Sequence, residues 1–334
     1  MICICDVTLL VLGLLSSVIP LTDTVGLTNR KRSVPVAQLV ATFSAGAKSE
    51  LTTFSLSSDG KWLALGTESG RIYVWAVKEA TAPKATLCPQ TLGRSKGIHC
   101  ISFSRDGKRL ACLVGERNGS VQVWSVATGK RIWGAYGIRH PSGISFSPDG
   151  KYLAVTDQRT LQFYTSEGKY LWAAKIDTAL RTFIEFTSKG RVVTGGHGSS
   201  SIRVWDQTTG RVLKRYGVNR LTALAWDANT GYLLVGALGQ YLSALELGSG
   251  KTIFRQPPES NNSLQVIAIP AMARYFLSGT DGSLVTFHDR RTGKELSRLS
   301  TWSSEDLAVT RDGTLFAVPV GARKVGLWKV KGGR

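Results

Sequence analysis

One short turn recurs seven times along this chain at nearly constant spacing. Its clearest copies are Phe-Ser-Arg-Asp-Gly-Lys at 103–108 and Phe-Ser-Pro-Asp-Gly-Lys at 146–151. The last turn residues of the seven copies stand at 60, 107, 150, 190, 231, 273 and 313, so that neighbouring copies are 40 to 47 residues apart. A period of this length is typical of repeated units built from four β-strands. The chain therefore reads as seven copies of one such unit.

Each unit repeats the same order of apolar positions. Two apolar residues, such as Ile101 and Phe103, alternate before the turn, and an apolar run such as 152–155 follows it. Alternation with a period of two indicates strands, and no long helical period occurs after residue 35. A third strand then ends in a large residue, which we interpret as a packing residue: Trp75, Trp124, Phe163, Trp205, Leu245, Phe287 and Trp328. The predicted fold class is all-β.

The segments Gly-Ile-Ser-Phe-Ser-Pro-Asp-Gly-Lys-Tyr-Leu-Ala-Val at 143–155 and Ser-Ile-Arg-Val-Trp-Asp at 201–206 resemble the WD40 repeat family, and the resemblance covers about residues 36–330. It implies a seven-bladed β-propeller of four-stranded antiparallel blades that serves as a rigid scaffold for protein binding. The chain also departs from the family. At the ends of the third strands only Trp205-Asp206 keeps the name-giving pair, and no Gly-His precedes an inner strand. Cohesion must therefore rest on strand pairing and apolar packing.

Closure of the ring can be predicted from the seventh copy. That copy, 307–330, provides three strands, and the apolar segment 36–43 is available as the fourth. Pairing the two segments in the last blade would remove an exposed sheet edge and link the ring. We therefore assign residues 36–334 to one propeller, expected to be monomeric, and residues 1–35 to a separate leader and linker.

The leader is apolar. Residues 1–21 contain one charged residue, Asp6, and their centre at 7–15 is almost wholly apolar. A signal peptide over residues 1–26 would make the protein secreted or extracytoplasmic. A membrane anchor and a misassigned start are the alternatives, which would leave the protein membrane-anchored or cytoplasmic. We expect membrane contact only through residues 1–21, if they are not cleaved.

Neither cofactor nor metal chemistry is indicated. Outside the leader, Cys88, Cys100 and Cys112 are an odd number without a C-x-x-C pair. We interpret them as buried free thiols, although Cys100 and Cys112 flank one predicted hairpin and could approach each other. The four histidines fall at different repeat positions, and no G-x-S-x-G or H-E-x-x-H motif occurs. The prediction is a protein that is not an enzyme, with no catalytic, cofactor-binding or metal-binding residues.

Two alternatives to a binding platform stay open. An extracytoplasmic enzyme could assemble a site in the central channel, and a purely structural module would have no mobile partner. The segments 128–133 and 167–172 also look like repeats of quinoprotein propellers. Those enzymes are expected to carry adjacent cysteines, which are absent from this sequence. We therefore interpret the similarity as blade architecture.

The segment Leu-Gly-Ser-Gly-Lys-Thr at 247–252 resembles the end of a phosphate-binding loop, but the position of its first glycine is occupied by Leu245. The same pair of glycine and a basic residue recurs in four other units, at Gly129, Gly168, Gly210 and Gly293. A phosphate loop has no reason to recur at this spacing. The glycine is instead predicted to adopt a positive φ in the turn between the last two strands.

Charge is the strongest functional feature. The chain has a formal net charge of +19, which favours acidic proteins or other polyanions as partners. Nucleic acid is a further candidate without sequence specificity, because most Trp and Phe residues occupy inward positions. Solvation of loop tips is the alternative explanation. Turns on one face are predicted to form a basic ring: Lys61, Lys108, Lys130, Lys151, Lys169, Lys189, Arg191, Arg211, Lys251 and Lys294.

The opposite face borders the mouth of the channel, where the family resemblance places partner binding. Loops before the inner strands carry a basic residue in five successive units, whereas the last two units have Asn262 and Glu305-Asp306 there. We predict that an acidic protein or polyanion binds to these five residues: Lys48, Lys96, Arg139, Arg181 and Arg220.

Deletion of residues 36–43 is expected to destabilise the whole ring, because the last blade would lose its outer strand and the two ends of the ring would no longer be joined. Thermal unfolding of the truncated chain measures this effect. An unchanged unfolding midpoint would contradict the seven-blade closure.

Overall fold

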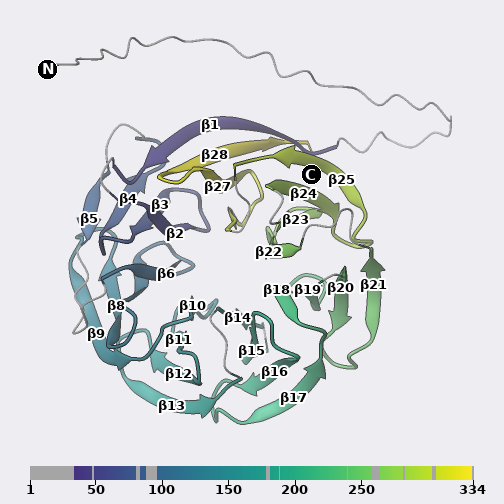
Figure 1. Cartoon of the computed structure of the whole chain (residues 1–334), viewed down its shortest axis with the longest axis horizontal. Coiled ribbons are helices and arrows are strands. Elements are labelled where there is room, and N and C mark those ends of the chain that lie inside the picture. The colour runs from purple at the N-terminus through teal and green to yellow at the C-terminus, as the bar shows by residue number, and fades with distance from the viewer. Residues whose placement is uncertain are drawn as a thin grey trace, which may run out of the picture. The chain divides into compact units, whose positions relative to one another are not determined.

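The computed structural model describes residues 34–332, except 47–48, 80–82, 88–95, 178–180, 188, 239, 258–262, 281–282 and 303–305. Within these residues, the strands form seven four-stranded antiparallel sheets. The sheets are the blades of a propeller around a central channel (Figure 1). The described part of the chain contains no helix. The predicted all-β, seven-bladed fold is thus confirmed.

Blades 1 to 6 each take four consecutive strands. Blades 1 to 3 comprise β2 (Leu51–Leu56), β3 (Trp62–Thr67), β4 (Ile72–Ala76) and β5 (Ala85–Leu87); β6 (Ile98–Phe103), β7 (Arg109–Val114), β8 (Gly119–Ser125) and β9 (Arg131–Ile138); and β10 (Gly143–Phe146), β11 (Tyr152–Thr156), β12 (Thr160–Thr165) and β13 (Tyr170–Lys175). Blades 4 to 6 comprise β14 (Thr182–Phe186), β15 (Arg191–Gly196), β16 (Ser201–Asp206) and β17 (Val212–Gly217); β18 (Leu221–Asp227), β19 (Tyr232–Ala237), β20 (Gln240–Glu246) and β21 (Thr252–Gln256); and β22 (Leu264–Ala268), β23 (Tyr275–Thr280), β24 (Leu284–Asp289) and β25 (Glu295–Ser300).

The seventh blade joins the two ends of the ring. It contains β26 (Ala308–Val309), β27 (Leu315–Gly321) and β28 (Lys324–Lys331), and β1 (Val36–Ser44) completes it. β1 runs antiparallel to β28, with Val36 opposite Lys331, as the adjacent purple and yellow strands of Figure 1 show. Closure by an N-terminal strand therefore occurs as predicted.

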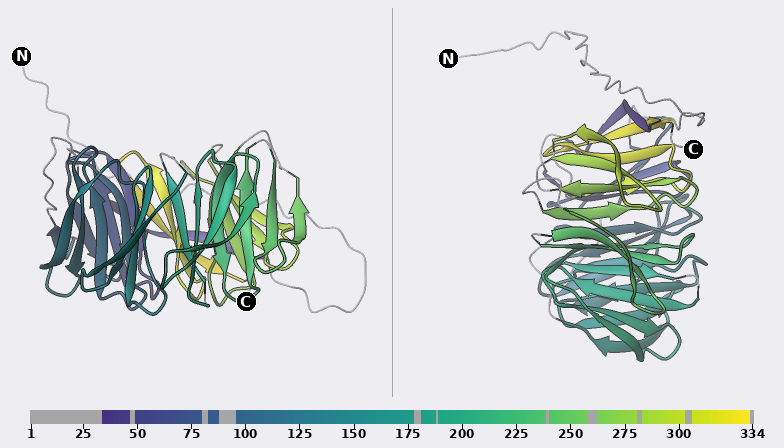
Figure 2. Two further views of the ribbon diagram at one scale, coloured as in Figure 1. Left: turned by 90° about the horizontal axis from the view of Figure 1, so that it is seen from below. Right: turned by 90° about the vertical axis from the view of Figure 1, so that its right-hand side faces the viewer.

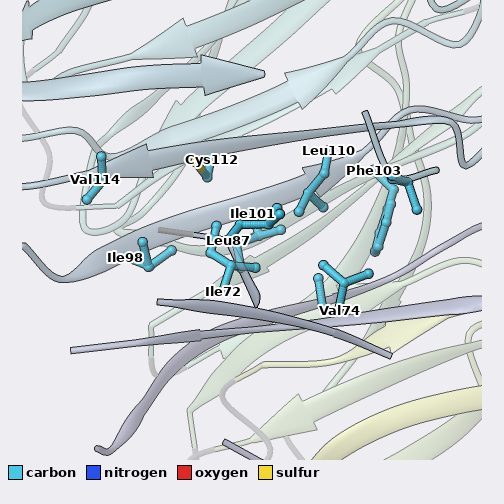
Figure 3. Close-up of a cluster of buried hydrophobic side chains, with 11 residues drawn as sticks. Ile72, Val74, Leu87, Ile98, Ile101, Phe103, Leu110, Cys112 and Val114 are labelled. Atoms are coloured by element: carbon cyan, nitrogen blue, oxygen red, sulfur yellow. The ribbon is translucent and has the colours of Figure 1, made fainter. Parts of the chain in front are cut away.

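The core lies between neighbouring blades. Figure 3 shows the cluster between blades 1 and 2, where Ile72 and Val74 of one sheet pack against Ile101 and Leu110 of the next. Six further clusters fill the other junctions. Between blades 7 and 1, Phe43 of β1 is 1% exposed. Burying such a side chain stabilises the folded state by about 1.5–3 kcal/mol, so this packing helps to keep β1 in the ring.

The recurring turn owes its shape to hydrogen bonds within it. The Ser104 hydroxyl donates to Asp106 Oδ1 over 2.6 Å and accepts from the Arg109 amide over 2.9 Å. Burial raises the pKa of the Asp106 carboxyl, but the hydrogen bonds from Ser104 and Lys108 outweigh it and lower that pKa. The same hydroxyl–carboxylate pair occurs in three other turns, between Ser57 and Asp59, Ser147 and Asp149, and Thr310 and Asp312.

Aromatic side chains of three outer strands donate hydrogen bonds to backbone carbonyls of the next blade, and we call these outer-strand contacts. The Trp133 indole nitrogen donates to the Ser166 carbonyl over 2.8 Å, and that of Trp172 donates to the Gln207 carbonyl over 3.0 Å. The Tyr216 hydroxyl donates to the Leu247 carbonyl in the same way. The tryptophans of the quinoprotein-like segments are thus contacts between blades.

A glycine of the neighbouring turn lies beneath each of these aromatic rings. A Cβ on Gly168 would come within 2.7 Å of Trp133, and one on Gly250 within 2.9 Å of Tyr216. Gly250 also has a φ of +80°. The equivalent glycines Gly129, Gly168, Gly210 and Gly293 have positive φ as well, so the prediction of a positive φ is confirmed. Lys251 precedes the outer strand, which begins at Thr252. The segment 247–252 is therefore a turn that receives an aromatic ring.

Blades 5 and 6 share a buried ion pair. Arg290 Nε donates to Asp227 Oδ2 over 2.6 Å, and Nη1 donates to the carbonyls of Pro270 and Ala273 over 3.0 and 2.8 Å. The side chains of Arg290 and Asp227 are only 6% and 2% exposed. Burial raises the pKa of Asp227, but the hydrogen bonds and charge of Arg290 outweigh it and lower that pKa.

We expect Arg290→Met to destabilise the protein by about 3–5 kcal/mol, because it leaves the Asp227 carboxylate buried without its partner. Adding Asp227→Asn should recover part of that loss. Arg109→Met is the matched control: it removes a more exposed pair with Glu167, and such pairs contribute about 0–1 kcal/mol. Urea unfolding followed by tryptophan fluorescence measures each value, and equal effects of the two arginine substitutions would refute this role for Arg290.

Candidate functional site

The inner strands enclose a cavity of about 700 Å³ in the central channel. Figure 1 shows these strands around its axis, and in the side views of Figure 2 the connecting loops gather on two opposite faces of the ring. Most of the polar groups in the cavity wall are hydroxyls: Thr52, Thr53, Ser55, Ser102, Ser142 and Thr182. Its titratable side chains are His99, Cys100, Arg181, Glu185 and Asp306. These five are the candidates for any chemistry inside the channel.

Irregular pairing occurs at the start of two inner strands that line the cavity. The pairing of β6 with β7 shifts between Ile98 and Cys100, and that of β2 with β3 shifts between Leu51 and Thr53. An extra residue at such a bulge is left out of the ladder and bends the strand. His99 and Cys100, at the irregularity of β6, both line the cavity, as do consecutive residues of the regularly paired β14.

An ion pair spans the mouth of the channel. Arg181 precedes β14 of blade 4, Asp306 precedes β26 of blade 7, and their Nη2 and Oδ1 atoms are 3.0 Å apart. The guanidinium also lies over the ring of Phe183, 5.7 Å from its centroid. The two charged side chains keep 42% and 37% of their surface exposed. The pair is therefore accessible to solvent and to a ligand.

Glu185 of β14 is a carboxyl group in the wall of the channel, and its side chain is partly buried. Desolvation raises the pKa of Glu185 to about 8. The Trp226 amide of the next blade donates a hydrogen bond to the carboxyl, which opposes this rise but does not cancel it. The carboxyl is therefore mostly protonated at neutral pH. Sequence reasoning missed this residue. The signal was present, because Glu185 stands between two apolar residues where other units have Ser55, Ser102 or Ala308.

The cysteines of blade 2 are free, as predicted. Cys100 packs toward blade 3, whereas Cys112 packs toward blade 1, so the two thiols point to opposite sides of their sheet. Burial raises the pKa of both thiols to about 12, which keeps them protonated. Cys88 lies outside the described residues.

One histidine has a structural role. His288 Nδ1 lies 3.0 Å from the Gly293 carbonyl, which only accepts, so Nδ1 carries the proton. Its Nε2 then accepts from the Ser278 hydroxyl over 2.7 Å. Burial lowers the pKa of His288 to about 4. The ring is thus a neutral bridge between strands, which also stacks on Phe276.

Four of the five predicted partner-binding residues are described. Lys96, Arg139 and Arg220 are exposed on loops before the inner strands, and none forms an ion pair with a described acid. Arg181 differs, because it is half-buried and paired with Asp306. Lys48 lies outside the described residues, as do Asn262 and Glu305.

The opposite face carries the predicted basic ring. Nine of its ten residues are exposed and Arg191 is half-buried. The two sets of turns lie together, since the Val126 amide donates to the Lys108 carbonyl over 2.9 Å. Asp59 pairs with Lys61 at 3.1 Å, so acidic groups partly offset the charge of this ring.

No group of three or more His, Cys, Asp or Glu side chains within the described ranges could hold a metal ion. No helix in this part of the chain is long and apolar enough to cross a bilayer. The predicted leader, residues 1–35, lies almost entirely outside these ranges, so its signal or anchor function stays a prediction.

Comparison with known proteins gives two findings. The family model "WD domain, G-beta repeat" matches residues 37–76 and 86–125. Each match spans the outer strand of one blade and the three inner strands of the next. A curated relative, "Protein tipD" of Dictyostelium discoideum, is 24% identical over 274 residues, which cover 76% of this chain and 42% of that protein. The chain thus spans less than half of the relative's length.

Glu185→Gln should stabilise the protein in a pH-dependent manner. The folded-state pKa of Glu185 is about 8 and its ordinary value is 4.5, so the wild type loses stability as the pH rises between these values. Glutamine does not ionise, and the free-energy difference between variant and wild type should therefore grow over this window. Urea unfolding at pH 5, 6.5 and 8 measures it. Glu167→Gln is the control, because Ser166 and Arg109 lower the pKa of Glu167 and its effect should have the opposite sign.

Proposed function

Because the chain is a WD40-repeat β-propeller protein, we propose that it is a non-enzymatic platform for acidic protein partners. The partner would bind to the channel-mouth face, defined by Lys96, Arg139, Arg181 and Arg220. WD40 propellers generally act as protein-interaction scaffolds. The acidic character of the partner is a proposal from charge.

One observation carries this proposal. Lys96, Arg139 and Arg220 present exposed cations on that face without an ion pair to a described acid. A protein of net charge +19 attracts acidic surfaces over a range of about 8–10 Å at moderate ionic strength. On the opposite face, carboxylates of the turns lie among the basic residues, as Asp59 does beside Lys61. Acidic residues such as Glu116 lie on the channel-mouth face as well. We favour this face because it borders the cavity and carries the accessible Arg181.

The chemistry of the channel does not favour the enzyme alternatives. The Cys100 thiol is protonated, and Arg181 and Asp306 are paired with each other. No nucleophile and base are joined by a hydrogen bond among the described side chains of the cavity. Secretion through the leader, a monomeric state and non-specific binding of nucleic acid stay predictions.

Charge reversal at Lys96, Arg139 and Arg220 should abolish capture of the native partners. The tagged protein and the triple variant K96E/R139E/R220E would be used for affinity purification, with quantitative mass spectrometry of the captured proteins. The matched control, K130E/K169E/K251E, reverses the same charge on the opposite face and should retain them. Capture should fall as salt is raised, since surface charges are screened. Equal loss with both variants, or capture insensitive to salt, would overturn the proposed surface.

A further inference from the structure

Arg181 is held in the mouth of the channel by its own blade. Its carbonyl accepts from the His197 amide over 2.8 Å, and its guanidinium lies over the Phe183 ring. These contacts do not involve blade 7. Asp306, in contrast, reaches the guanidinium from the other side of the channel. The guanidinium therefore has a contact within its own blade besides the acid with which it pairs.

The ion pair is of a kind that another carboxylate can replace. Both side chains are more than a third exposed, and exposed ion pairs contribute little to stability. A guanidinium matches the planar geometry of a carboxylate, whichever molecule supplies it. The cavity below the pair has a volume of about 700 Å³, so an entering side chain finds space there.

We propose that the mouth of the channel is a carboxylate subsite. Asp306 forms an ion pair with Arg181 there until an acidic side chain of the partner takes the place of Asp306. This inference rests on the proposed function, since the cations of Lys96, Arg139 and Arg220 would bring the acidic partner to this face. It adds a specific anchor, in which one partner carboxylate enters the channel while others contact the exposed cations.

The test uses a fluorescein-labelled oligoglutamate peptide and the full chain, with dissociation constants measured by fluorescence anisotropy at low salt. Asp306→Asn removes the carboxylate that pairs with Arg181 across the channel and should tighten binding about fivefold. The control Glu116→Gln removes one exposed negative charge from the same face without releasing Arg181, and should tighten binding less than about twofold. Arg181→Met should weaken binding and cancel the gain from Asp306→Asn. Thermal unfolding of each variant verifies that it is folded.

The outcomes separate this inference from the proposed function. Equal effects of Asp306→Asn and Glu116→Gln would overturn the subsite, even if K96E/R139E/R220E still abolished binding and so upheld the docking surface. Binding that survives K96E/R139E/R220E would refute the docking surface instead. A fivefold gain with Asp306→Asn that disappears in the double variant Asp306→Asn, Arg181→Met would support the subsite.

Discussion

The whole ring depends on how each sheet packs against the next. A single blade has two apolar faces and buries neither of them alone. The clusters that bury them, such as Ile72 and Val74 against Leu110, always draw on two neighbouring blades. The outer-strand contacts act at the circumference, where Trp133 and Trp172 reach the next blade. Stability is therefore a property of the junctions, and a ring without a free face is the arrangement in which every junction is filled.

The ring of blades explains how the channel-mouth face acquires its geometry. Loops from different blades meet there, and their starting points are set by the strands to which they are attached. Arg181 and Asp306 meet across the channel although 125 positions separate them along the chain. The face thus combines exposed cations around its edge with one paired cation at its centre. Such a pattern suits a partner that offers several acids, one of which projects.

Sequence reasoning recovered the periodic features of this molecule. The turns and the alternating inner strands follow from spacing, and the closing segment follows from the seventh copy together with the family resemblance. The features that it missed are contacts between residues far apart in the sequence. The pairing of Arg290 with Asp227 and of Arg181 with Asp306 depends on how far apart positions meet in the ring. Trp133 was assigned to blade architecture, but its bond to Ser166 required the neighbouring blade. The loops that carry the candidate site could be placed from the repeat, and the ion pair between two of them could not.

The polypeptide crosses every junction between blades, including the step from β1 of blade 7 to β2 of blade 1. The ring is closed without a covalent link inside blade 7, where β1 pairs with β28 through hydrogen bonds and Phe43 packs against blade 1. Val36 and Lys331 face each other there as cross-strand partners, and such partners have Cα atoms about 4.5–5.5 Å apart. A short peptide could join them, and a new pair of ends could be opened in a loop of another blade. The order of blades around the ring is therefore independent of where the chain starts, so circularly permuted chains share one set of native contacts.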